Sequence, residues 1–154
     1  PVLVKLANNK KISDFMTDAF PHPYTLSDGS KFIDNSLKDN PLKFHAIVFD
    51  DIVCGSIGIF PQLDVHSKNA EIGYWLGEEY WNIGIMTVAI DKIVKYGFNT
   101  WDLRRIVARA FGNNKPSHKV LEKNGFLLEA KLKGAIYKNG QFLDEYFYTI
   151  SHRI

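Results

Sequence analysis

The sequence has few of the residues that crosslink small proteins or bind metals. Cys54 is the single cysteine among 154 residues, which excludes an intramolecular disulfide and a multi-thiolate metal site. The five histidines show no spacing typical of metal ligands, so we expect no metal. Lysine and arginine exceed aspartate and glutamate by only 19 − 17 = 2, which gives no reason to expect nucleic acid or membrane as a partner. The lone cysteine favours a reducing, cytoplasmic compartment.

Long apolar runs, a leader and low-complexity tracts are also missing. The longest apolar runs, such as residues 57–60, fall far short of the ~20 residues that span a membrane. Residue 1 is proline, and no basic and apolar leader follows, so we expect the numbered chain to be a processed or trimmed product. With no repeat and no flexible linker, residues 1–154 are expected to form a single domain.

Apolar residues are plentiful, and their spacing alternates between helical and extended periods. They make up 45% of the chain, and aromatic residues 14%, which calls for a core or a lined pocket. Helices are expected over 1–7, 12–16, 84–98 and 115–123, and over a further segment that Ser27 and Asp28 cap. Strands are expected over 44–49, 52–60, 70–76, 105–111, 126–137 and 142–150. This order predicts an α+β fold, a mixed and mostly antiparallel sheet with a central β-α-β unit and helices on both faces.

Two details of these elements are specific enough to test. The helix over 84–98 is expected to bury one apolar stripe. The stripe consists of Ile85, Val88, Ala89, Ile93 and Val94. His118 and Arg109 are expected at the surface, Arg109 near a sheet edge, and Cys54 as a small buried residue.

The turn after residue 76 is the stretch most indicative of function. A strand ends there, and a short link leads to a helix that begins near Gly84. The free N–H groups and positive dipole end of such a helix favour an anion, and a glycine lets it approach closely. The turn has neither the Gly-Lys-Ser/Thr of a P-loop nor the Gly-x-Gly-x-x-Gly of a dinucleotide site. An ordinary strand-to-helix turn remains the alternative interpretation.

Two ordered blocks of sequence resemble GNAT N-acetyltransferases, and within them the RimJ/RimL-like branch. The first block comprises residues 71–77 (EIGYWLG) and 80–87 (YWNIGIMT). The second comprises 114–117 (NKPS) and 120–126 (VLEKNGF). A weaker match covers 21–25 (PHPYT) followed by Asp28. The resemblance covers most of the chain from about residue 8, and it implies the GNAT fold with its first strand missing.

The resemblance implies acetyl-CoA as co-substrate. The pantetheine arm would lie along Tyr74, Trp75 and Leu76, and Asn114 would hydrogen-bond it. Backbone N–H groups at the helix start would bind the pyrophosphate, namely those of Asn82, Ile83, Gly84, Ile85, Met86 and Thr87. Of the wider superfamily's glycine motif, only the middle glycine is kept at Gly84.

The resemblance also implies direct attack of an amine on the acetyl thioester. Glu71, directly or through a water chain, is the candidate base, and a backbone N–H near Leu76 would stabilise the oxyanion. The superfamily often places a tyrosine acid at the position of Leu121, so the donor role is assigned here to Ser117. Phe20 and Tyr24 are expected to line the acceptor side.

The acceptor itself stays open between protein N-terminal α-amines and small amines. The missing first strand and the hairpin-ended sheet both allow a homodimer. Because Leu121 cannot donate a proton, a non-catalytic acyl-CoA-binding module or sensor is the alternative to an enzyme.

Overall fold

Six strands form one mixed sheet in the computed structural model, which describes residues 1–152. The strand order is β1-β2-β3-β4-β6-β5. The strands are β1 (Phe44–Phe49), β2 (Ile52–Pro61), β3 (Asn69–Leu76), β4 (Arg105–Phe111), β5 (Leu127–Lys138) and β6 (Gln141–Ser151). Strand β3 pairs with β4 in parallel, whereas β1 with β2, β4 with β6 and β5 with β6 are antiparallel, which confirms the predicted α+β class and its central β-α-β unit.

Five α-helices and two short 3-10 turns accompany the strands within residues 1–152. The helices are α1 (Val2–Ala7), α2 (Lys10–Ser13), α3 (Leu26–Ser36), α4 (Ile85–Thr100) and α5 (Lys115–Lys123), and the 3-10 turns are η1 (Asp64–His66) and η2 (Glu78–Tyr80). In this described part of the chain, α1 precedes every strand, and no helix is both long and apolar enough to cross a membrane.

The chain divides into two compact units. The first comprises Pro1–Gly58 and Tyr74–Ile85, and the second comprises Ile59–Gly73 and residues 86–152. Strands β2 and β3 each contribute residues to both units.

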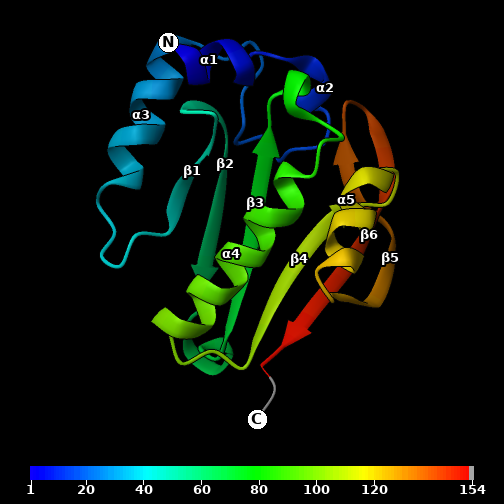
Figure 1. Cartoon of the computed structure of the whole chain (residues 1–154). Coiled ribbons are helices and arrows are strands. Elements are labelled where there is room, and N and C mark those ends of the chain that lie inside the picture. The colour runs from blue at the N-terminus through cyan, green and yellow to red at the C-terminus, as the bar shows by residue number, and fades with distance from the viewer. Residues whose placement is uncertain (153–154) are drawn as a thin grey trace. The chain divides into compact units, whose positions relative to one another are not determined.

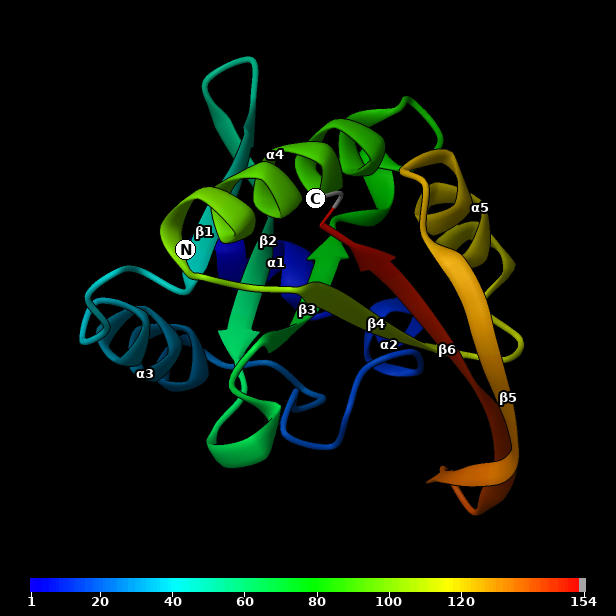
Figure 2. The same ribbon diagram turned by 90° about the horizontal axis from the view of Figure 1, so that it is seen from below.

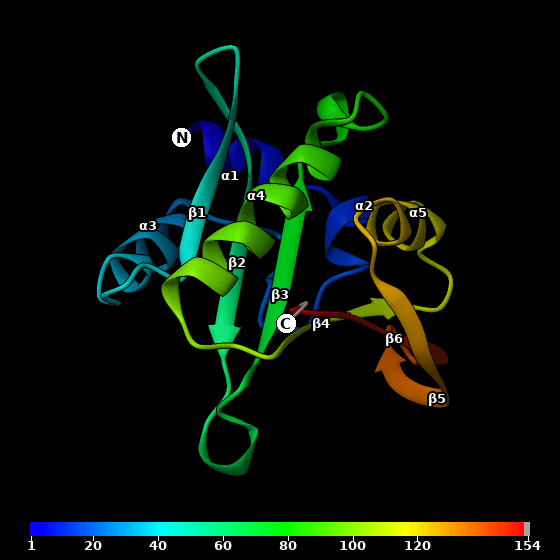
Figure 3. The same ribbon diagram turned by 60° about the horizontal axis from the view of Figure 1, so that its bottom comes forward.

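A tight hairpin joins β1 to β2 in the first unit (Figure 3). Its two turn residues, Asp50 and Asp51, both adopt left-handed backbone conformations, with φ of 48° and 60°. Two successive positive φ values match the right-handed twist of the flanking strands, and aspartate tolerates them better than most residues. The strands expected over 44–49 and 52–60, on either side of this turn, are confirmed by β1 and β2. Cys54 on β2 is fully buried, as expected.

The N-terminal helices build a small aromatic core in the first unit. Ala7, Ile12, Tyr24 and Trp75 are buried together, and the Phe20 ring packs 5.7 Å from that of Trp75. Helices α1 and α3 lie side by side (Figure 1), because Gly29 leaves room for a methyl group of Val4.

The N-cap of α3 is Thr25, so the predicted cap at Ser27 and Asp28 is wrong. The Thr25 hydroxyl accepts a hydrogen bond from the Asp28 N–H, and the Asp28 carboxylate accepts one from the Thr25 N–H. This reciprocal pair is a capping box, in which Asp28 stands at the third helical position and the cap lies three residues earlier.

Helix α4 connects the two parallel strands of the second unit. It buries Ile90, Ile93, Val94 and Gly97, where a Cβ would lie 2.3 Å from a methyl carbon of Ile59. Val88, predicted to face inward, is 55% exposed instead. At about 100° per residue, Val88 lies on the side of the helix opposite these four residues, so the expected inward stripe, which left out Ile90, is wrong at Val88.

The β5–β6 hairpin forms the other side of the second unit, and α5 lies alongside it (Figure 1). Its pairing register shifts between Leu128 and Ala130 and again between Leu132 and Ile136, where Gly134 adopts a φ of 62°. Such irregularities bend a strand, and Figure 2 shows the hairpin curving near its turn. The turn itself contains Asn139 and Gly140, which are both left-handed, and an Asn-Gly pair favours such hairpin turns.

Gly55 on β2 is a position where the fold requires glycine. A Cβ there would lie 2.3 Å from the Trp75 carbonyl oxygen, which is backbone and cannot move aside. We expect Gly55→Ala to lower the free energy of unfolding by about 2–3 kcal/mol, measured by urea denaturation. Gly73→Ala is the control, because its Cβ would meet only Phe60 at an ordinary 3.7 Å. Equal losses from both variants would contradict the assignment.

Candidate active site

Strand β3 ends in a buried stretch and continues into an exposed turn within the first unit. Trp75 and Leu76 are each 7% exposed, whereas Ile83 is 58% exposed. Asn82 and Gly84 adopt left-handed conformations, with φ of 61° and 85°. A Cβ at Gly84 would meet nothing within 4 Å, so the turn is open as well as strained. Directly after it, Ile85 begins the 16-residue helix α4.

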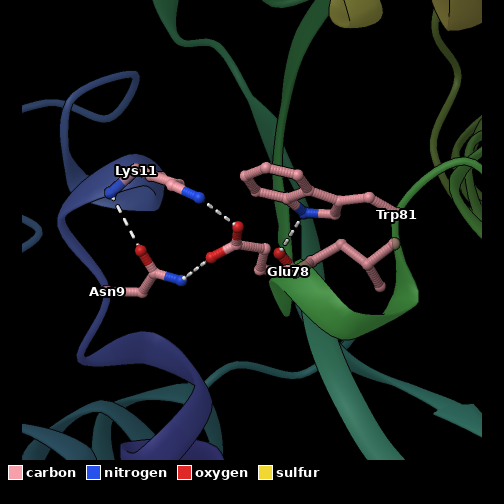
Figure 4. A network of polar contacts seen from close by, with 5 residues as sticks. Asn9, Lys11, Glu78 and Trp81 are labelled. Carbon is pink, nitrogen blue, oxygen red and sulfur yellow. Dashed lines mark hydrogen bonds and ion pairs between the residues drawn. The ribbon is translucent and has the colours of Figure 1, made fainter.

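The Trp81 side chain closes this turn back onto the end of β3. Its indole Nε1 donates a hydrogen bond of 2.8 Å to the carbonyl oxygen of Leu76 (Figure 4). The contact fixes one end of the turn while leaving the segment from Asn82 to Gly84 exposed. The sequence block that suggested a ligand site contained Trp81, but its spacing did not indicate this bond.

Glu78 joins the same region to the N-terminal segment. One carboxylate oxygen accepts a 2.7 Å hydrogen bond from Asn9 Nδ2, and the other pairs with the Lys11 ammonium (Figure 4). These bonds, with the Lys11 charge, hold the pKa of Glu78 below its ordinary value. Asn9 and Glu78 lie 69 positions apart in sequence, so no local pattern could indicate the pair.

In the second unit, Glu71 lies on β3 opposite Val107 of β4. Its carboxylate is 3.7 Å from Arg109 Nε, and Arg109 Nη1 lies 3.7 Å from the Glu145 carboxylate. Burial raises the pKa of Glu71, the Arg109 charge opposes that rise, and the Glu145 charge adds to it. The result is a half-buried carboxylate that holds its proton more readily than an exposed one.

These charged groups occupy one face of the second unit's strands. Side chains alternate along a strand, and the register pairs Arg109 with Phe147 and Phe111 with Glu145. Arg109 lies 5.0 Å over the Phe147 ring, which orients the guanidinium. Because β4 pairs with both β3 and β6, the prediction that Arg109 lies near a sheet edge is wrong.

Helix α5 packs against β6 on the other face of these strands, away from Glu71 and Arg109. Asn114 is the N-cap, and its side-chain oxygen accepts a 3.4 Å hydrogen bond from the Ser117 N–H. Ser117 is 8% exposed. His118, expected at the surface, is half-buried: its ring stacks on Tyr146 at 4.6 Å and its Nε2 lies 3.0 Å from the Phe111 carbonyl oxygen.

Two more aspects of this face constrain proton transfer. Leu121 stands where the superfamily often has a tyrosine acid. It is fully buried and packs in the core. Tyr148 is buried, and its hydroxyl donates a 3.3 Å hydrogen bond to Glu122. Burial and the Glu122 charge raise the pKa of Tyr148 to about 12. The Tyr148 hydroxyl therefore keeps its proton at neutral pH.

Phe20 and Tyr24, expected on the acceptor side, lie in the aromatic core of the first unit. Their ring centroids are 5.1 Å apart, and Tyr24 is 6% exposed. Burial is the main cause that raises the pKa of Tyr24.

The strand order, the β3-α4-β4 crossover and the open turn before α4 can be compared with known proteins. The sequence model of the GNAT acetyltransferase domain matches residues 1–127. The chain belongs to the GNAT acetyltransferase family. Residues predicted to bind or react are distributed over both units: Tyr74 to Ile85 in the first, and Glu71, Met86, Thr87, Asn114 and Ser117 in the second.

Two curated GNAT relatives and one solved structure show the range of the similarity. The uncharacterized N-acetyltransferase YnaD of Bacillus subtilis is 34% identical over 128 residues, 82% of this chain and 74% of the relative. The ribosomal-protein-serine acetyltransferase of Escherichia coli is 34% identical over 107 residues, 70% of this chain and 59% of the relative. The microcin C7 self-immunity acetyltransferase MccE, solved with acetyl-CoA and AMP, superposes with a TM-score of 0.80 at 29% identity, over 97% of this chain and 83% of that one.

The matches span between 54% and 74% of the length of the curated relatives. The match to a ribosomal-protein acetyltransferase agrees with the RimJ/RimL-like resemblance of the two sequence blocks.

The Glu78 contacts predict a pH-dependent stability. A carboxylate whose pKa is lowered on folding stabilises the fold above its unfolded pKa, near 4.5, and loses that contribution as the pH falls through the lower folded value. We expect Glu78→Gln to melt below the wild type at pH 7, with the difference in Tm shrinking toward pH 3. Glu79→Gln, next to it in η2, is the control. A Tm difference that grows toward acid pH would contradict the prediction.

Proposed function

We propose that this chain is an N-acetyltransferase that transfers the acetyl group of acetyl-CoA to a primary amine in a ternary complex. The observation that carries the proposal is Glu71, a half-buried carboxylate with a raised pKa on the strand that leads into the open turn. Because its pKa is raised, this carboxylate is a stronger base than an exposed one, which suits it to accept a proton from an amine. The family provides the class of reaction, and the solved MccE complex, which holds acetyl-CoA, supports the co-substrate.

The turn between β3 and α4 fits the pyrophosphate of acetyl-CoA. Its left-handed residues, Asn82 and Gly84, and the empty space at Gly84 leave the backbone accessible. The first N–H groups of a helix have no partners within that helix and attract anions. We assign the pyrophosphate to residues 82–87, and the pantetheine arm to the backbone of Tyr74, Trp75 and Leu76, with Asn114 as a further donor. Acetyl-CoA supplies the activated acetyl group.

In the proposed mechanism, Glu71 accepts the proton of the acceptor ammonium, directly or through water. A neutral amine is needed because only its free lone pair can attack a carbonyl carbon. A backbone N–H near Leu76 stabilises the developing oxyanion, and the Ser117 hydroxyl donates a hydrogen bond to the departing sulfur.

The acceptor class proposed first is the α-amine of a protein N-terminus. The name of the E. coli relative, a ribosomal-protein-serine acetyltransferase, supports this choice. A small amine is the second candidate, and a screen over both classes decides between them.

A substitution at Gly84 tests the assigned phosphate site. Gly84→Asp places a side chain and a negative charge in the open turn, so we expect the Kd for acetyl-CoA to rise at least about 100-fold in calorimetry. Gly134→Asp is a matched control, since Gly134 also has a positive φ and empty space around its Cβ. Unchanged acetyl-CoA affinity in folded Gly84→Asp would remove the phosphate site from this turn.

Substitutions at Glu71 and Ser117 test the chemistry. We expect Glu71→Gln to lower kcat about 100-fold or more and Ser117→Ala about 10-fold, each with little change in the Kd for acetyl-CoA. The assay follows CoA release with peptides that begin with serine or alanine and with a panel of small amines.

If the chain is instead a non-catalytic acyl-CoA sensor, the same assay should give a different result. The observation that favours the sensor is the buried Leu121, which cannot donate a proton where the superfamily often has a tyrosine acid. Acetyl-CoA binding without turnover of any acceptor would favour the sensor. Turnover that Glu71→Gln leaves intact would instead remove Glu71 from the mechanism.

A further inference from the structure

Arg109 is placed between two carboxylates that come from different strands. Its Nε lies 3.7 Å from Glu71 on β3, and its Nη1 lies 3.7 Å from Glu145 on β6. Both separations exceed the 2.7–2.9 Å of a charge-assisted hydrogen bond, so neither carboxylate binds the guanidinium tightly. One positive charge is therefore divided between two negative ones.

Packing holds Arg109 in this divided position. The guanidinium carbon lies 5.0 Å from the centre of the Phe147 ring, and Phe147 is the residue paired with Arg109 across the β4–β6 ladder. The side chain of Glu145 is only 15% exposed, compared with 36% for Glu71 and 45% for Arg109. Because less water screens Glu145, it competes well with Glu71 for the shared charge.

We propose that Arg109 is a positioning residue for Glu71, and that Glu145, by sharing its charge, determines at which pH Glu71 releases its proton. The inference rests on the proposed function, in which Glu71 is the base. If Arg109 paired with Glu71 alone, the carboxylate would be a weaker base, because a full ion pair stabilises its charged form. Sharing Arg109 with Glu145 leaves Glu71 oriented but still able to accept a proton.

The groups around Glu71 in the second unit are few. Arg109 faces it from β4 and Glu145 from β6. The segment of β2 in this unit, residues 59–61, carries no titratable side chain. Burial, Arg109 and Glu145 are the causes that act on its pKa, and the two charges act in opposite directions.

Two substitutions separate the two charges. Arg109→Gln removes the cation, so we expect the pKa of Glu71 to rise by about 0.5–1 pH unit. Glu145→Gln removes a negative charge and leaves Arg109 to Glu71 alone, so we expect that pKa to fall by about 0.3–0.5 pH unit. Arg109→Lys keeps the charge and should bring the pKa of Glu71 back toward the wild-type value.

The direct measurement is an NMR titration of the glutamate side-chain carboxyl carbons in the full chain. The Glu71 signal is assigned by its loss in Glu71→Gln. Arg105→Gln is the matched control, because Arg105 lies on the same face of β4, four residues away, and pairs with Glu129. The control should shift the pKa of Glu71 by less than about 0.2 pH unit.

Opposite shifts in Arg109→Gln and Glu145→Gln support the proposal. Shifts in the same direction, or shifts no larger than in Arg105→Gln, overturn it. The pH profile of kcat/KM then tests the proposed function separately. Its acidic limb should move to higher pH in Arg109→Gln and to lower pH in Glu145→Gln. If the NMR shifts occur and the acidic limb stays in place, the inference about Glu71 stands and its role as base fails.

Discussion

Parallel pairing between β3 and β4 is the constraint on which much of the second unit depends. Two parallel strands need a crossover between them, and here α4 provides it. The crossover places the start of α4 one short link after the end of β3, and the register sets Glu71 beside Val107, two residues from Arg109. One pairing thus determines both the position of the open turn and the neighbourhood of the half-buried carboxylate. The antiparallel return of β6 then brings Glu145 to the same face.

Much of the fold could be predicted from the sequence because its signals are local. The bounds of β4 and α5 agree with prediction to the residue, since period-two alternation marks the strand and an Asn-Gly stop marks the helix end. The errors lie where a local pattern has more than one solution. Thr25 and Ser27 are both good N-caps, and only the reciprocal bond of Asp28 selects Thr25. Val88 was placed in the inward stripe, but the buried face of α4 follows Ile90, Ile93 and Val94, and Val88 lies opposite it.

The candidate site was less predictable, because its contacts join distant parts of the chain. Glu71 was proposed from the family resemblance, on the strand along which the thioester would lie, and its role and those of the other predicted residues remain predictions. Glu78 was missed because its partners, Asn9 and Lys11, lie 69 and 67 positions away in sequence. The contact between Arg109 and Glu145 depends on how β4 and β6 align, and the sequence of neither strand alone determines that register.

The outer strand of the β5–β6 hairpin, described above for its bends, has a further consequence. β5 ends the strand order, so one row of its backbone N–H and C=O groups faces no strand of the described chain. Such a row can recruit strands from other molecules. Lys131 and Lys133 are exposed on β5, and the pairing register shifts between Leu132 and Ile136, around Gly134. Repulsion between like charges and a locally irregular backbone both weaken the pairing of a second copy along this edge.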